Sequence, residues 1–199
     1  MDYEMLLKSV MQYETLYNRG LKFEANSMLK NLCYSIESLS TDDRETVLKQ
    51  LVNDICETET MTFLFERGNG QIPFQLKSVI YNWLYPRCRQ NMTPELRWFY
   101  QIFKNDPDHC ELANNFLDEA YAHTTGDMRI QQLVFERNLN SLDYGLHELP
   151  IGILISDEEA QIIFQQCDAI IQNCNIPKIL IDRYFKLKHD YLMYKASEN

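Results

Sequence analysis

Two pairs of ionisable residues have a spacing that could support chemistry on one face of a helix. Glu119 lies four residues before His123, and Asp143 lies four residues before His147. Residues at i and i+4 share a helix face, so each pair could supply two metal ligands or one acid–base couple. Glu148 adds a carboxylate next to the second pair. One hypothesis is therefore a metal-dependent or hydrolytic helical enzyme that uses Asp143, His147 and Glu148.

These pairs lack the companions that a metal centre needs. Di-iron bundles use Glu and His at i and i+3 on two helices, with further carboxylates from two other helices. The sequence contains no second matching set. Polar pairs at i and i+4 are routine on helix surfaces. The sequence therefore predicts no metal ligand, no cofactor and no catalytic residue.

The dipeptide His109–Cys110 places an imidazole beside a thiol, a combination that can generate a reactive thiolate. Adjacent residues of a helix point about 100° apart, so these two side chains cannot hold each other. We expect Cys110 to pack inward and His109 to be a solvated residue of the first turn. No two cysteines form a C-x-x-C pair. Free and mostly buried thiols in a reducing compartment are expected at Cys33, Cys56, Cys88, Cys110, Cys167 and Cys174.

Arg97 and Trp98 are the candidate residues for binding a partner. The neighbouring residues Leu96, Phe99, Tyr100 and Phe103 complete one apolar helix face. Arg97 and Trp98 are displaced from that face, and both residue types are enriched in the energetic centres of protein interfaces. The sequence predicts that Trp98 is an exposed anchor. The alternative is that another helix of the chain covers it.

Two other segments have unusual composition. Residues 149–155 (LPIGILI) are apolar but cannot readily continue a helix through Pro150. We expect an extended connection tucked against the core, with the floor of a groove as the alternative. Residues 183–188 (RYFKLK) mix basic and aromatic side chains. A docked amphipathic terminal helix is favoured there over a platform for single-stranded nucleic acid.

The elements that position all these residues are helices. Apolar residues recur with a 3.6-residue period between capping residues and prolines, with almost no alternating strand pattern. The fold predicted is all-α, with eight or nine antiparallel helices packed as stacked hairpins, either a bundle or a short repeat-like array. We expect one domain over residues 1–199, with a subdivision near residues 68–72 as the alternative. The expected helices are 3–17, 21–39, 42–55, 73–86, 94–103, 107–126, 127–146, 156–171 and 177–194.

Charge limits the partners that this chain can take. The 199 residues have a net charge of −10, which opposes binding to nucleic acid and to anionic membranes. The longest apolar run, 149–155, is too short to span a bilayer, and the N-terminal residues lack the pattern of a signal peptide. We therefore expect a cytoplasmic protein whose partner is another protein, a basic one in particular.

The leading functional hypothesis combines these expectations. It is a non-enzymatic, acidic helical protein that binds another protein, in an immunity-type or adaptor role. The analogy with immunity proteins rests on size and charge alone.

Overall fold

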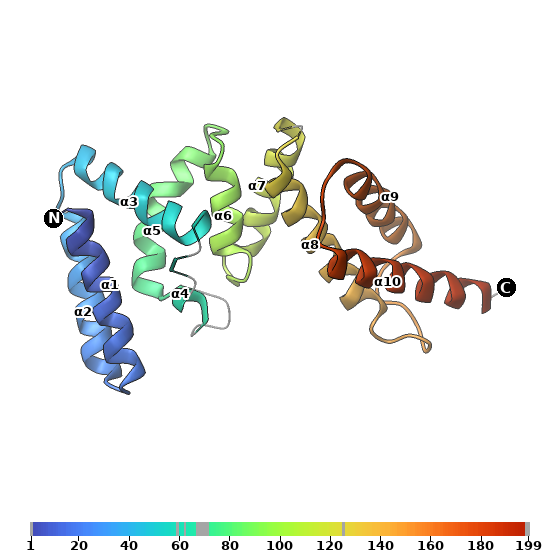
Figure 1. Cartoon of the computed structure of the whole chain (residues 1–199), viewed down its shortest axis with the longest axis horizontal. Coiled ribbons are helices and arrows are strands. Elements are labelled where there is room, and N and C mark those ends of the chain that lie inside the picture. Colours follow the sequence, from blue (N-terminus) through green and yellow to red (C-terminus); the bar gives the residue numbers. More distant parts are fainter. Residues whose placement is uncertain (1, 59, 62, 67–71, 125, 198–199) are drawn as a thin grey trace. The chain divides into compact units, whose positions relative to one another are not determined.

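The structure is a computed structural model that describes residues 2–58, 60–61, 63–66, 72–124 and 126–197 (Figure 1). It is all-α, as predicted, with no strand among these residues. Within the described part, no helix combines the length and the apolarity needed to cross a membrane. The helices are α1 Tyr3–Asn18, α2 Lys22–Glu37, α3 Thr41–Cys56, α4 Phe63–Glu66, α5 Phe74–Cys88, α6 Glu95–Phe103, α7 Cys110–His123, α8 Met128–Leu146, α9 Asp157–Asn173 and α10 Lys178–Ser197.

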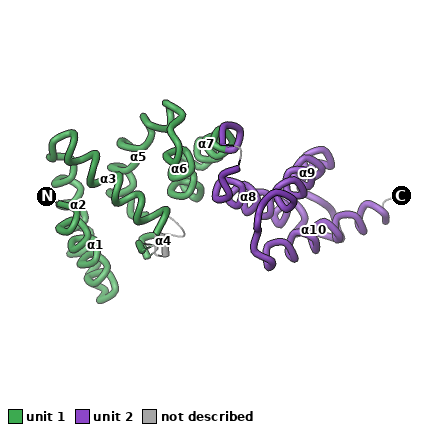
Figure 2. Tube along the Cα trace, turned by 45° about the horizontal axis from the view of Figure 1, so that its top comes forward, with its two compact units in different colours: residues 1–120 green, residues 121–199 purple. Residues whose placement is uncertain are grey.

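The chain divides into two compact units, residues 1–120 and 121–199 (Figure 2). The boundary falls inside α7 and not near residues 68–72. The predicted linker Gly68–Gly70 lies outside the described residues. The single domain expected for residues 1–199 stays a prediction.

Unit 1 begins with an antiparallel hairpin of α1 and α2. The chain reverses at Gly20, whose φ of 79° lies in the left-handed region that only glycine adopts without strain. The α2 helix then packs on α5, and α3 packs on both α5 and α6. Three phenylalanines of the core, Phe99, Phe103 and Phe116, are fully buried and in ring contact. Stacked helical hairpins and their neighbours thus form the unit, as the sequence predicts.

Unit 2 is built on α8, which contacts both α9 and α10. Two carboxylates of α9 each accept hydrogen bonds from a tyrosine and a lysine of α10. The two sets are Asp168 with Tyr184 (2.8 Å) and Lys188 (2.7 Å), and Asp157 with Tyr191 (3.0 Å) and Lys195 (2.9 Å). Both tyrosines are buried. The prediction of a docked terminal helix is therefore confirmed. The helix is less amphipathic than predicted, because Ile179, Phe185, Leu192 and Met193 are exposed.

Several predicted helix boundaries hold and others do not. The capping box of Ser156 and Glu159 is present at the start of α9. Pro86 does not stop α5, which continues to Cys88. The start signal at Asp106 is present, since its carboxylate accepts from the backbone N–H of Asp108 (2.9 Å) and its carbonyl from that of Cys110 (2.8 Å). The first residues form a turn, and the regular helix α7 starts at Cys110. The four-residue α4 was not predicted.

Candidate partner-binding site

Trp98 and Arg97 are not on the surface. Trp98 is 3% exposed and Arg97 is also buried. The Trp98 indole Nε1 donates a hydrogen bond of 2.5 Å to Glu57 Oε1, at the C-terminal end of α3. Arg97 Nη2 lies 2.6 Å from the same carboxylate oxygen. The prediction of an exposed anchor at Trp98 is wrong, because α3 covers the side of α6 from which these two side chains project.

The residues of the enzyme hypothesis make contacts other than those predicted. Asp143 forms an ion pair with Arg183 of α10 and not with His147. His147 Nδ1 donates to the carbonyl oxygen of Tyr144 (2.5 Å), and its Nε2 lies 2.9 Å from Glu148. Side chains of all three residues, Asp143, His147 and Glu148, are a third to a half exposed.

The other pair does not assemble either. At the end of α7, Glu119 is partly buried and His123 is exposed. No hydrogen bond or ion pair between these two side chains is found in the described structure. In the same residues, no group of three or more His, Cys, Asp or Glu is arranged to hold a metal ion.

The turn between α6 and α7 contains a fully buried carboxylate, Asp106. It accepts hydrogen bonds from Lys77 Nζ of α5, from His109 Nδ1 (3.0 Å) and from the backbone N–H of Asp108 (2.9 Å). Burial by itself raises the pKa of Asp106, but the bonds from Lys77 and His109 outweigh it, so the pKa lies below its usual value. The His109 ring also packs on Tyr81, at 4.5 Å between centroids. The His109 side chain is 27% exposed, so the expectation that it is solvated holds only in part.

All six cysteines are free, and four of them are buried, as expected. Cys110 is partly exposed, against the expectation that it packs inward. Burial raises the pKa of Cys33 to about 11 and that of Cys167 to about 12. Protonated thiols are poor nucleophiles, so these two behave as small apolar side chains.

The connection between α8 and α9 exposes apolar side chains. Figure 1 shows it as a loop that projects beyond the helices of unit 2. Ile151 is 88% exposed, Tyr144 is 70% exposed, and Leu154 is also exposed. With His147 and Glu148, these residues form what we call the α8–α9 tip. The sequence identified the segment as unusual but predicted that it lies against the core, which is wrong for Ile151 and Leu154.

Both ends of this loop are fixed. The backbone N–H of Leu154 donates to the carbonyl of Gly145 at 2.7 Å, and that of Ile151 donates to Glu148 at 2.8 Å. The Ser156–Glu159 capping box then starts α9. The tip is therefore positioned before any partner arrives, which lowers the entropic cost of binding.

The segment that contains the α8–α9 tip is acidic. Residues 143–159 contain five acidic residues and neither Lys nor Arg. Two of these carboxylates are neutralised by α10, through the pairs Asp143–Arg183 and Asp157–Lys195. The other three acidic residues of this segment, Glu148, Glu158 and Glu159, are exposed.

Gly145 is the position on which the loop geometry depends. A Cβ added there would lie 2.6 Å from Ile155 Cγ2 and 2.8 Å from Ile155 Cβ. We expect Gly145→Ala to displace Ile155 and to lower the free energy of unfolding by about 1–3 kcal/mol, as overpacking does. Gly152→Ala, where a Cβ meets nothing within 4 Å, is the matched control. Urea unfolding followed by circular dichroism compares the two, and equal stabilities would contradict the contact.

Comparison of the chain with models of protein families, with curated proteins and with solved structures gives no match.

Proposed function

We propose that this chain is a non-enzymatic protein that binds another protein through the α8–α9 tip. The observation that supports this most strongly is Ile151, which is 88% exposed in a loop whose two ends are fixed. Ile151, Leu154 and Tyr144 are all exposed within one short segment, and exposed apolar patches often mark interaction sites. Tyr144 adds an aromatic side chain of the type that dominates interface energetics.

The chemistry of the tip defines the partner that fits it. An apolar pocket would receive Ile151 and Leu154, and Lys or Arg side chains around the pocket would face the acidic residues of segment 143–159. The net charge of −10 favours the same basic partner by attraction at longer range. An immunity-type or adaptor role is the version of this function that we favour.

The enzyme hypothesis receives less support from the same residues. Asp143 forms an ion pair with Arg183, and His147 lies against Glu148. Each of these side chains therefore has a structural contact that accounts for its position. We also propose the cytoplasm as the location of the protein, since all six thiols are free.

A substitution at the tip tests the function. Ile151→Asp removes the apolar anchor and adds a carboxylate that a pocket cannot solvate. We expect it to weaken capture of a partner from the lysate of the source cells by more than about tenfold, as for the centre of an interface. Quantitative mass spectrometry of proteins retained by wild type and variant gives the measurement.

The matched control is Ile179→Asp, at an exposed isoleucine of α10 in the same unit. It makes the same chemical change away from the tip and should leave capture unchanged. Circular dichroism of both variants checks that they fold. Equal capture by wild type and Ile151→Asp would show that the tip does not bind the partner.

A further inference from the structure

Unit 1 contains a cavity of about 250 Å³ that is lined by α3, α5 and the end of α2. Its apolar lining consists of Leu48 of α3 and of Val79 and Trp83 of α5, all three buried. A water molecule occupies about 30 Å³ in the liquid, and pockets for drug-sized molecules begin at about 300 Å³. The cavity therefore has the size for a small organic molecule.

The Trp83 side of the cavity is held by an internal ion pair. Glu45 of α3 accepts a hydrogen bond of 2.7 Å from Trp83 Nε1 and is paired with Arg87 of α5. Arg87 Nη1 donates to the Trp83 carbonyl at 2.7 Å, and its guanidinium carbon lies 4.5 Å from the centre of the Trp83 ring. The charges of Glu45 and Arg87 thus satisfy each other. This side of the cavity is positioned before a ligand arrives, which lowers the entropic cost of binding.

Two other charged side chains of the lining have no such partner. Arg44 of α3 is partly buried, and Glu37, the last residue of α2, is exposed. Within the part of the chain that the structure describes, neither side chain forms an ion pair or a hydrogen bond, and the two do not pair with each other. Thr41 and Asn82 add a hydroxyl and an amide to the same lining. The cavity therefore offers one unpaired charge of each sign.

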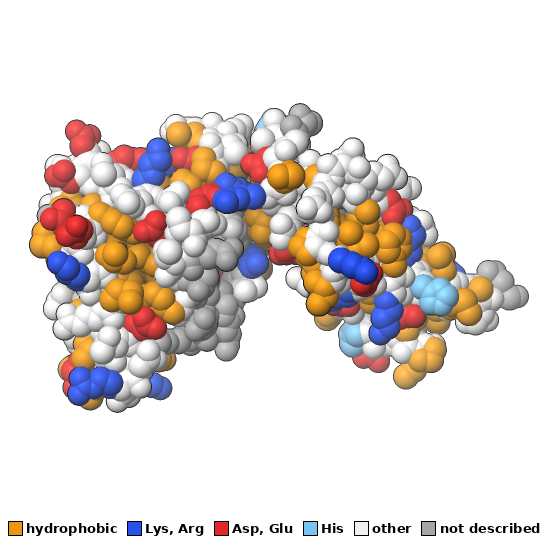
Figure 3. Space-filling model, viewed as in Figure 1, with side chains coloured by type: hydrophobic (Ala, Val, Ile, Leu, Met, Phe, Trp, Pro, Cys, Tyr) orange, Lys and Arg blue, Asp and Glu red, His pale blue; other side chains and the backbone are white. Residues whose placement is uncertain are grey.

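The charges of the lining select a ligand that carries both signs. Its four charged side chains, two acidic and two basic, sum to zero. Asp42 and Asp43 of the same turn are exposed and lie outside the lining. Figure 3 shows basic and acidic side chains next to one another on the surface of unit 1. A purely anionic or purely cationic ligand would leave Glu37 or Arg44 unpaired, whereas a zwitterion pairs with both.

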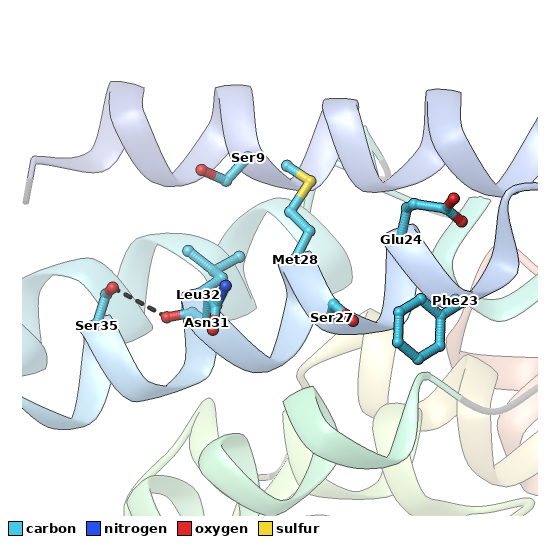
Figure 4. A pocket seen from close by; sticks show the side chains of 8 residues that line it. All are labelled: Ser9, Phe23, Glu24, Ser27, Met28, Asn31, Leu32 and Ser35. Carbon is cyan, nitrogen blue, oxygen red and sulfur yellow. Dashed lines mark hydrogen bonds between the residues drawn. The ribbon is translucent and has the colours of Figure 1, made fainter.

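A larger groove on the α1–α2 hairpin lacks this combination (Figure 4). It has a volume of about 510 Å³, but Glu24 is the one charged residue of its described lining. Serine and asparagine make up half of that lining, and the Ser35 hydroxyl already donates to the carbonyl of Asn31 at 2.9 Å. The groove is larger but does not contain groups that would select a ligand.

We propose that the α3–α5 cavity binds a free α-amino acid with an apolar side chain. The carboxylate of the ligand pairs with Arg44, whose planar guanidinium can donate two hydrogen bonds to it. The ammonium group pairs with Glu37, and the side chain lies against the apolar lining around Trp83. A free amino acid carries both charges on one small molecule, whereas a residue at the end of a peptide keeps only one of them.

Saturation-transfer difference NMR of the full chain tests the proposal with L-leucine and L-methionine at millimolar concentration. We expect both probes to bind. N-acetyl-L-leucine lacks the ammonium group and L-leucinamide lacks the carboxylate. Each derivative should bind at least about tenfold more weakly than L-leucine, the effect of losing a hydrogen bond to a charged group.

Two variants assign each end of the ligand to its residue. Arg44→Gln and Glu37→Gln should each weaken L-leucine binding at least about tenfold. Arg44→Gln should bind L-leucinamide like wild type, and Glu37→Gln should bind N-acetyl-L-leucine like wild type, because the missing charges were partners. The controls Arg19→Gln and Glu24→Gln make the same changes at exposed residues outside the cavity and should bind L-leucine like wild type. Circular dichroism checks that all variants fold.

Three results would overturn the proposal. The first is that neither L-leucine nor L-methionine binds. The second is that a derivative binds as tightly as L-leucine, and the third is that the control variants lose as much affinity as the cavity variants. The cavity belongs to unit 1 and the α8–α9 tip to unit 2, so none of these results bears on the proposed function.

Discussion

Trp98→Ala is expected to lower the free energy of unfolding by about 3–5 kcal/mol, the range for removing a large aromatic side chain from a core. Trp98 is 3% exposed, so the substitution leaves a cavity inside the protein that solvent does not fill. It also removes the indole donor to Glu57, which joins α6 to the end of α3. The expected effect is a loss of stability and not a selective loss of binding.

Two further variants separate the causes of that loss. Trp98→Phe keeps most of the ring volume but removes the hydrogen bond to Glu57, so its effect should be smaller, about 1–3 kcal/mol. Phe23→Ala removes an aromatic ring that is 82% exposed and should change stability by less than about 0.5 kcal/mol. Urea unfolding is followed by circular dichroism, because one of two tryptophans is removed. A Trp98→Ala protein as stable as wild type would contradict the burial described here.

Asp106→Asn is expected to cost about 3–5 kcal/mol of stability at neutral pH, as when one member of a buried ion pair is removed. The variant leaves Lys77, which is only 12% exposed, without its counter-charge. It also exchanges the strong acceptor of His109 for a neutral amide. The turn between α6 and α7 should loosen, since three donors converge on this one carboxylate.

The effect of Asp106 should depend on pH in one direction. Its pKa in the folded protein lies below the usual value, so the unfolded chain takes up the proton first. The stabilisation is therefore complete above the unfolded pKa of about 4 and is lost as the pH falls through the lower, folded pKa. The difference in stability between wild type and Asp106→Asn should shrink in acid.

The neighbouring Asp108 provides the matched control. Its side chain is exposed, and Asp108→Asn makes the same chemical change in the same turn. We expect a change within about 0.5 kcal/mol and no loss of the acid sensitivity of wild type. Equal effects of the two substitutions, at neutral pH and in acid, would show that the buried ion pair with Lys77 does not stabilise the turn.

The helices could be predicted from the sequence because their determinants are local. The capping box of Ser156 and Glu159 and the reversal at Gly20 involve neighbouring residues, and both are present in the structure. Apolar residues at helical spacing likewise define the buried face of a helix, and this holds whichever other helix packs against that face. The all-α class depends on such patterns alone.

The surfaces could not be predicted in the same way. Whether Trp98 is exposed depends on α3, about forty residues earlier in the chain, and Glu57 gives no sign in the sequence of its contact with the indole. The sequence identifies Asp106 as a helix start, but it does not show that Lys77 of α5 donates to the same carboxylate and that the carboxylate is buried. In both cases the deciding partner comes from another helix or turn.

In the α8–α9 tip, some features could be predicted from the sequence and others depend on the tertiary structure. The sequence alone determined that residues 149–155 are apolar and that Pro150 ends the helix. Hydrophobicity by itself predicts burial, so Ile151 and Leu154 were expected against the core. Only the tertiary structure decided that they are exposed, because Ile155 lies beside Gly145 and Leu149 and Ile153 are partly buried, whereas Ile151 and Leu154 meet solvent. Local sequence determines which residues are apolar and therefore favour burial. The packing of the helices determines which of these residues the chain itself buries.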